Sequence, residues 1–173
     1  FNKNDIYLKE DFTEKSIKSL KLDKYSVLSF ATHGIVANEL SNINEPGLIT
    51  TPPIEGTQHN DGVLSSSEIK NLKLNAELVI LSACNTAAGD GSSSAEGLSG
   101  LTSSFFYAGA RSLLVSHWYV EDESTVDLMK STFTNLEDDV SLSESLRSSK
   151  IAMINNESTS HPIFWAPFIL KKK

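Results

Sequence analysis

The chain has 173 residues, enough for one domain of ordinary size, and 39% of them are hydrophobic, which suffices for one core. Its net charge of −7 argues against nucleic acid as a direct partner and against an anionic membrane surface, because both select a basic face. A single cysteine excludes an internal disulfide and a cysteine-rich zinc site, and favours a reducing, cytoplasmic setting. The sequence also has neither an apolar run of membrane-spanning length nor a signal-peptide pattern.

The start of the chain predicts a strand, a helix and a second strand. Residues 6–8 form a short apolar patch that is interpreted as a strand. The helix that follows carries apolar residues at helical spacing and ends at Leu22. Residues 25–32, YSVLSFAT, are rich in strand formers and predict a buried strand that stops at His33.

A long connection separates this strand from the next one. Residues 35–62 are dominated by Asn, Pro, Gly and Ser, and a loop of this length inside a domain is often functional. Short strands at 47–50 and 63–64 would form a hairpin there. A short helix at 67–72 then leads to a buried strand at 77–82.

The second half of the chain alternates helices and strands. The pattern predicts a helix at 95–108, a strand at 111–118, helices at 124–136 and 142–154, and an apolar tail at 161–170 that packs against the core. Such alternation predicts an α/β sandwich around a mainly parallel sheet. No repeat or linker divides the chain, so we expect a single domain. Because it enters structure at once without an initial methionine, we also expect a fragment of a longer protein.

Two of the predicted strands end in residues that suit nucleophilic catalysis. One strand ends at His33, and the other ends beside Cys84, the only cysteine. If the strands are parallel neighbours, about 4.8 Å apart, the imidazole and the thiol emerge at the same edge of the sheet. A histidine there could take the proton of a thiol whose pKa is near 8.5 and later protonate a leaving amine. The N–H groups of Gly34 and Cys84 could form an oxyanion hole.

Less specific explanations stay open for these residues. A lone cysteine at the end of an apolar strand is often a buried small hydrophobe. His117, at the end of the strand at 111–118, is a rival to His33 as the partner of Cys84. The Gly/Ser-rich residues 89–97 match no phosphate-binding motif, so nucleotide binding is not expected.

Several motifs in the same order resemble one family. They are ATHG at 31–34, PGL at 46–48, DGVLSSSEI at 61–69, LNAELVILSACNTAAGDG at 74–91, EGLSGLTSSFFYAGARSLLVSHWYVED at 96–122 and HPIFWAPFIL at 161–170. The chain resembles a CHAT domain, a caspase-like peptidase module often found beside TPR repeats in bacterial proteins. The resemblance covers most of residues 25–170.

The resemblance implies a fold, a reaction and partners. The fold is a caspase-like three-layer αβα sandwich. The reaction is peptide-bond hydrolysis through an acyl-enzyme, with His33 as general base and acid, Cys84 as nucleophile and Gly34 as an oxyanion donor. The substrate is a protein or peptide, and TPR repeats or another domain of the full-length protein would regulate the site. No metal or organic cofactor is implied. The alternative is a catalytically silent scaffold that keeps the fold.

Two further expectations follow from the same family. Caspase-like folds carry an opening strand and helix before the region of residues 6–8, and this chain has almost nothing upstream, so that strand is either missing or the fold is compact. Residues before the cysteine and at the end of the next strand line the specificity pocket in relatives, which implies Ser82, Ser116 and Asp122 here. Asp122 would attract a basic P1 residue. The alternative is that Asp122 or Glu123 is the N-cap of the next helix.

Overall fold

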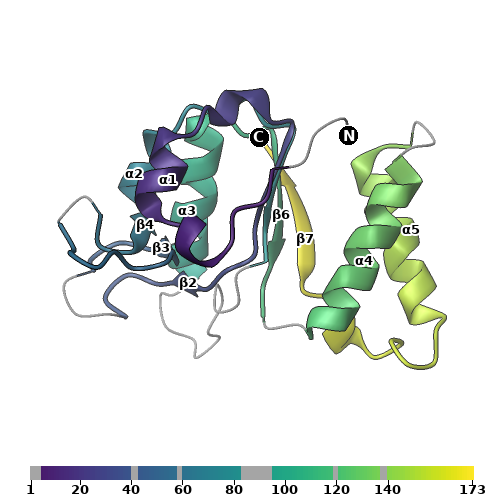
Figure 1. Cartoon of the computed structure of the whole chain (residues 1–173). Coiled ribbons are helices and arrows are strands. Elements are labelled where there is room, and N and C mark those ends of the chain that lie inside the picture. The colour runs from purple at the N-terminus through teal and green to yellow at the C-terminus, as the bar shows by residue number, and fades with distance from the viewer. Residues whose placement is uncertain (1–4, 40–42, 58–59, 83–94, 119–120, 137–139) are drawn as a thin grey trace.

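The computed structural model describes residues 5–39, 43–57, 60–82, 95–118, 121–136 and 140–173 (Figure 1). Its main sheet has four strands in the order β1-β5-β6-β7. Their bounds are Val27–Phe30 (β1), Leu78–Leu81 (β5), Ser112–Ser116 (β6) and Phe168–Lys172 (β7). The first three run parallel and β7 pairs antiparallel with β6, which confirms the predicted α/β fold with a mainly parallel sheet.

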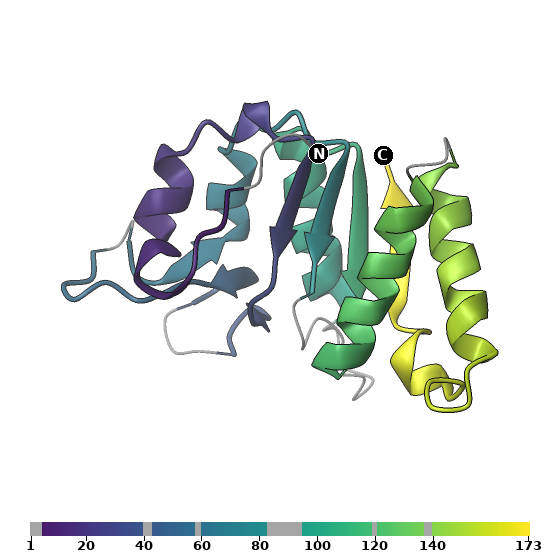
Figure 2. The ribbon, with the colours of Figure 1, turned by 45° about the vertical axis from the view of Figure 1, so that its right-hand side comes forward.

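Helices cover both faces of the main sheet (Figures 1 and 2). One face carries α1 (Glu14–Ser19), α2 (Ser66–Lys70) and α3 (Ala95–Ala108), and the other carries α4 (Asp122–Asn135) and α5 (Leu142–Ile154). The described residues also contain short 3₁₀ helices at Lys9–Asp11 (η1), Leu22–Lys24 (η2) and Pro162–Phe164 (η4). The result is the expected three-layer sandwich.

Strand β5 lies between β1 and β6, and all four of its residues are buried. Val79 and Leu81 join the core on the side of α1, α2 and α3, whereas Leu78 and Ile80 join the core on the side of α4 and α5. A strand covered on both faces needs apolar side chains at every position, which is why its sequence is a continuous apolar run.

A second, smaller sheet follows β1. It contains β2 (Gly34–Ile35), β3 (Gly47–Ile49) and β4 (Val63–Ser65), all antiparallel. The predicted hairpin is therefore confirmed. A Cβ added to Gly47 would lie 2.7 Å from Cγ1 of Val63 and 2.9 Å from the carbonyl oxygen of Leu64, so this position requires glycine.

The predicted strand at residues 6–8 is wrong. The backbone there pairs with no strand in the described part of the chain, and the side chains of Ile6 and Leu8 are 77% and 66% exposed. A three-residue apolar run is too short to form a strand unless a neighbouring strand offers hydrogen bonds. Correspondingly, β1 is paired with β5 on one side, and no strand among these residues pairs with its other edge.

The apolar tail packs as predicted. Phe168 is 1% exposed and belongs to the core on the side of α4 and α5. The two prolines lie outside β7, one in η4 and one directly before the strand. Among the described helices, none has the length and apolar character needed to cross a membrane.

Candidate functional site

His33 lies at the carboxyl end of β1, between the main sheet and the smaller sheet. Its backbone is fixed, because its carbonyl oxygen accepts a hydrogen bond of 2.8 Å from the N–H of Ile49. The hydroxyl of the preceding residue, Thr32, donates to the carbonyl oxygen of the same Ile49 over 2.6 Å. The imidazole itself is on an exposed residue. The arrangement holds the main chain rigidly and leaves the ring accessible to a second reactant.

Gly34 is buried in β2 directly after His33 and pairs with Leu48 of β3. The first strand of the smaller sheet therefore begins at the residue directly after His33. Sequence reasoning identified His33 and Gly34 but not the two bonds to Ile49. The one feature of the sequence that points to these bonds is Thr32, because a hydroxyl directly before the histidine can donate to a neighbouring backbone.

The end of β5 is adjacent to that of β1. The N–H of Ser82 donates to the carbonyl oxygen of Phe30 over 3.1 Å, so the pairing continues one residue beyond the strand. Each pair in the β1–β5 register is 51 residues apart in the sequence, and so are His33 and Cys84. Cys84 itself lies outside the described residues, as does the loop that follows it.

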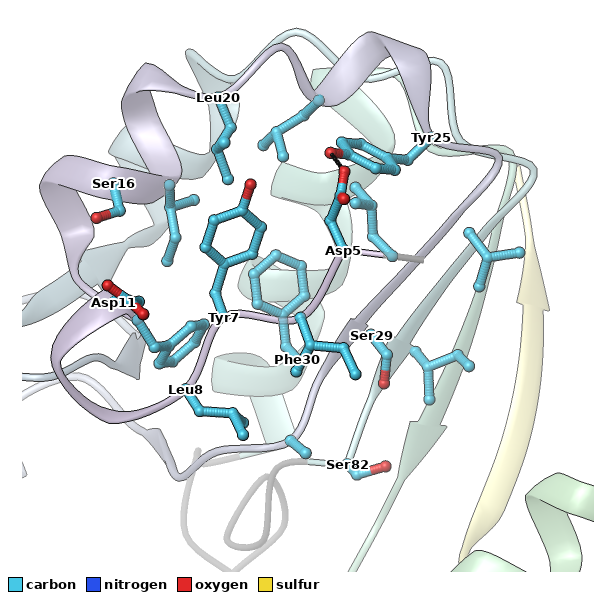
Figure 3. Close-up of a pocket in the computed structure, with 18 of the residues that line it drawn as sticks. Asp5, Tyr7, Leu8, Asp11, Ser16, Leu20, Tyr25, Ser29, Phe30 and Ser82 are labelled. Atoms are coloured by element: carbon cyan, nitrogen blue, oxygen red, sulfur yellow. Dashed lines mark hydrogen bonds between the residues drawn. The ribbon is translucent and has the colours of Figure 1, made fainter. Parts of the chain in front are cut away.

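Ser82 lines a groove of about 1020 Å³ beside β1 (Figure 3). The groove is bounded by residues 5–9, by β1, by Ile80 and Ser82, and by Met129 and Phe133 of α4. In Figure 3 Ser82 lies at one end of it, Tyr25 and Asp5 lie at the other, and Ser29 lies between them. The hydrogen bond from the Tyr25 hydroxyl to Asp5 is the largest of the effects that raise the pKa of Tyr25 to about 12.

The next strand end holds Ser116 and His117. Ser116 is the last residue of β6 and is buried, and the N–H of His117 donates to the carbonyl oxygen of Pro167 over 3.0 Å. Nε2 of His117 is buried and has no hydrogen-bond partner among the described residues. Burial, and then the positive charge of Lys171, lower the pKa of His117. His117 thus remains a second imidazole, directly after the strand β6 that pairs with β5.

Asp122 is the first residue of α4 and is exposed. The alternative that Asp122 or Glu123 is the N-cap is wrong, because Glu121 occupies that position. The carboxylate of Glu121 accepts from the hydroxyl of Ser124, and its carbonyl oxygen accepts from the hydroxyl of Thr125. Asp122 therefore lies in the first turn, where the helix dipole favours a negative charge.

No group of three or more His, Cys, Asp and Glu residues in the described ranges could hold a metal ion. The residues around His33 instead offer an exposed imidazole, a rigid backbone and a neighbouring parallel strand end. That arrangement suits acid–base chemistry on a group carried by the adjacent strand.

Two sequence comparisons relate the chain to known proteins. Tetratricopeptide repeat protein 28 of Mus musculus is 31% identical over 108 residues, which are 62% of this chain and 4% of that protein. The chain therefore corresponds to a small part of that relative. The family model of the CHAT domain matches residues 1–172. Because that match covers nearly the whole sequence, this chain belongs to the CHAT domain family, a module related to the caspase-like cysteine peptidases.

Proposed function

We propose that this CHAT domain is a cysteine endopeptidase that hydrolyses peptide bonds with His33 and Cys84. The observation that carries the proposal is the parallel β1–β5 register, whose offset of 51 residues is also the separation of His33 and Cys84. Side chains that follow parallel strands at the same offset emerge at the same edge of the sheet.

The chemistry proceeds in two stages. His33 takes the proton of the Cys84 thiol, and the thiolate attacks the carbonyl carbon of the scissile bond. The N–H groups of Gly34 and Cys84 stabilise the oxyanion of the tetrahedral intermediate. His33 then protonates the leaving amine, and water, activated by the same imidazole, hydrolyses the acyl-enzyme.

Substrate selection is assigned to three residues around this edge. Ser82, two residues before Cys84, borders the groove beside β1, and Ser116 ends the strand next to β5. Asp122 is an exposed carboxylate at the start of α4 that attracts a basic P1 side chain. The preferred substrate is thus a protein segment with Lys or Arg before the scissile bond.

The chain is proposed to act as one domain of a longer, cytoplasmic protein. The mouse relative is a tetratricopeptide repeat protein by name, and this supports TPR repeats as the regulatory partner. The acidic net charge and the single cysteine support the cytoplasmic setting and the absence of nucleic-acid and membrane partners.

Labelling with an electrophilic peptide probe that carries Lys at P1 tests the proposal. The wild-type protein should be labelled at Cys84, and Cys84→Ala should not be labelled. His33→Ala should slow labelling roughly 10²–10⁴-fold, the usual contribution of a general base.

His117→Ala is the matched control, because it removes the rival imidazole. Its labelling rate should stay near the wild-type value. Normal labelling of His33→Ala with slow labelling of His117→Ala would transfer the role to His117. No labelling of Cys84 in the wild type, alone or with a TPR partner, would favour the scaffold.

A further inference from the structure

One carboxylate in this protein is buried without belonging to the candidate site. Glu14, the first residue of α1, is 0% exposed. Its carboxylate accepts hydrogen bonds from the N–H groups of Asp61, over 2.9 Å, and Gly62, over 3.2 Å. The ammonium of Lys18, one turn later in α1, pairs with the same carboxylate. A buried charge with three hydrogen-bond donors is stabilised, and loss of the charge leaves the donors without an equal partner.

The backbone that Glu14 holds leads into the hairpin β3–β4. Gly62 has a φ of +92°, and a Cβ there would lie 3.0 Å from Cα of Pro52, so its conformation requires glycine. The carbonyl oxygen of Gly62 accepts from the N–H of Thr50 over 2.8 Å. Thr50 follows directly after β3. Glu14 thus fixes the end of the hairpin at which the loop joins β3 to β4.

A second contact joins the same two parts of the chain. The N–H of Thr51 donates to the carbonyl oxygen of Phe12 over 2.8 Å, and its hydroxyl donates to the carbonyl oxygen of Lys9 over 2.6 Å. Residues 9–14 therefore accept hydrogen bonds from both sides of the loop between β3 and β4. The polar contacts at Thr51 and at Gly62 thus join residues 9–14 and the hairpin β3–β4 into one unit.

That unit in turn holds His33. Ile49 ends β3 and donates to the carbonyl oxygen of His33, while its own carbonyl oxygen accepts from Thr32. A continuous series of hydrogen bonds and peptide bonds therefore joins the Glu14 carboxylate to the backbone of His33. It passes through Gly62, Thr50 and Ile49.

Lys18 extends the network to a further element. Its ammonium also donates to Glu68 over 2.6 Å, and Glu68 completes the capping box of α2 with Ser65. Ser65 ends β4, so the ionic contacts reach both ends of the second hairpin strand. The helix α1, the hairpin and α2 are held by one set of charges.

We infer that Glu14 is a positioning residue for His33, acting through the hairpin β3–β4. The inference rests on the proposed role of His33 as general base.

Glu14→Gln tests the inference, since glutamine keeps the size and removes the charge. The imidazole resonances of His33 should shift in the NMR spectrum, while those of His161 stay fixed. The amide of Ile49 should exchange with solvent about tenfold faster, whereas the amides of Val79 and Ile80 in β5 should not. Alkylation of Cys84 should move toward the pH dependence of a free thiol, with a midpoint at about pH 8.5.

Glu144→Gln is the control, because Glu144 is exposed on α5 and pairs with Arg147. If Glu14→Gln does not fold, Thr51→Val removes one of the other contacts and should produce the same changes at His33 and Ile49, with smaller size. Thr134→Val, on the exposed side of α4, is its control.

Uniformly faster exchange in the hairpin and in β5, with unchanged His33 resonances, would assign Glu14 a purely structural role and overturn the inference. The resonances of His33 and the exchange of Ile49 do not depend on the reactivity of Cys84. An unreactive Cys84 in the wild type would therefore contradict the proposed function, and unmoved His33 resonances in Glu14→Gln would contradict the coupling.

Discussion

The hydroxyl of Thr32 donates a hydrogen bond of 2.6 Å to the carbonyl oxygen of Ile49. Since Ile49 also donates its N–H to the carbonyl oxygen of His33, one residue of β3 holds two consecutive residues of the chain that follows β1. The exposed imidazole therefore extends from a backbone with little freedom. A general base gains from such rigidity because its position relative to the nucleophile is set before substrate binds.

Thr32→Val should weaken that arrangement. The change removes the donor and leaves the Ile49 carbonyl oxygen without the hydroxyl, so the free energy of unfolding should fall by about 1 kcal/mol in urea denaturation. Thr159→Val is a matched control, because Thr159 donates a similar bond, of 2.9 Å, to the carbonyl oxygen of Met153. Both variants should lose similar stability, and only Thr32→Val should slow labelling of Cys84. Equal labelling rates would separate Thr32 from the site.

The contrast between β5 and Glu14 indicates what the sequence can predict. The run LVIL is apolar at every position, and local pattern alone identifies a strand covered on both faces. Glu14 is charged and next to other polar residues, so pattern places it on the surface. It is buried because its partners, Asp61 and Gly62, come from a hairpin more than 40 residues later. Such partners are set by tertiary packing, which a local sequence pattern does not report.

The same reason explains the error at the start of the chain. Residues 6–8 have the composition of a strand, but a strand is defined by a hydrogen-bonded neighbour, and none pairs with them in the described ranges. The sequence predicts the N-cap of α4 at Asp122 or Glu123, and the structure has it at Glu121. The pattern does not separate these positions, because all three acidic residues suit a helix start. The pairing of β1 with β5, in contrast, joins two buried apolar runs that the local pattern identifies as strands.

The ion pair of Lys18 and Glu68 should make stability depend on pH. Burial raises the pKa of Glu68, but hydrogen bonds from Lys18 and from the N–H of Ser65 outweigh it and lower the pKa overall. A lowered carboxyl pKa contributes stability above the unfolded value of ~4.3, and this contribution is lost as the pH falls through the folded value. Urea midpoints of the wild type should therefore decline below about pH 4.5.

Glu68→Gln should flatten this decline. Because the pair is partly exposed, the difference between the two proteins at pH 7 should not exceed about 1 kcal/mol. Glu144→Gln serves as the control, since its partner Arg147 is on the surface. If the urea midpoints of the wild type and of Glu68→Gln decline equally down to pH 3, the ion pair contributes nothing to the loss of stability in acid.

Gly47→Ala should disturb the hairpin that holds His33. The added Cβ would lie 2.7 Å from Val63 and 2.9 Å from the Leu64 carbonyl oxygen, and the backbone oxygen cannot rotate away. The strands must separate locally, so the free energy of unfolding should fall by about 1–3 kcal/mol, and Ile49 should lose protection against hydrogen exchange. Gly56→Ala is the control, because its nearest neighbour lies 3.9 Å away. Equal stabilities of the two variants would contradict the close approach of β3 and β4.

Asp122→Asn tests the assignment of a basic P1 residue. The exposed carboxylate stands in the first turn of α4, and its pairing with a substrate cation in solvent is worth ~1 kcal/mol. Cleavage of a peptide with Lys at P1 should therefore slow about fivefold in kcat/KM, and cleavage of the same peptide with Leu at P1 should not change. Asp127→Asn, exposed five residues further along α4, removes the same charge at a greater distance and should leave both rates nearly unchanged. If Asp122→Asn slows both peptides equally, the carboxylate acts on the helix start and not on the substrate, and the selection of P1 has to reside in Ser82 and Ser116.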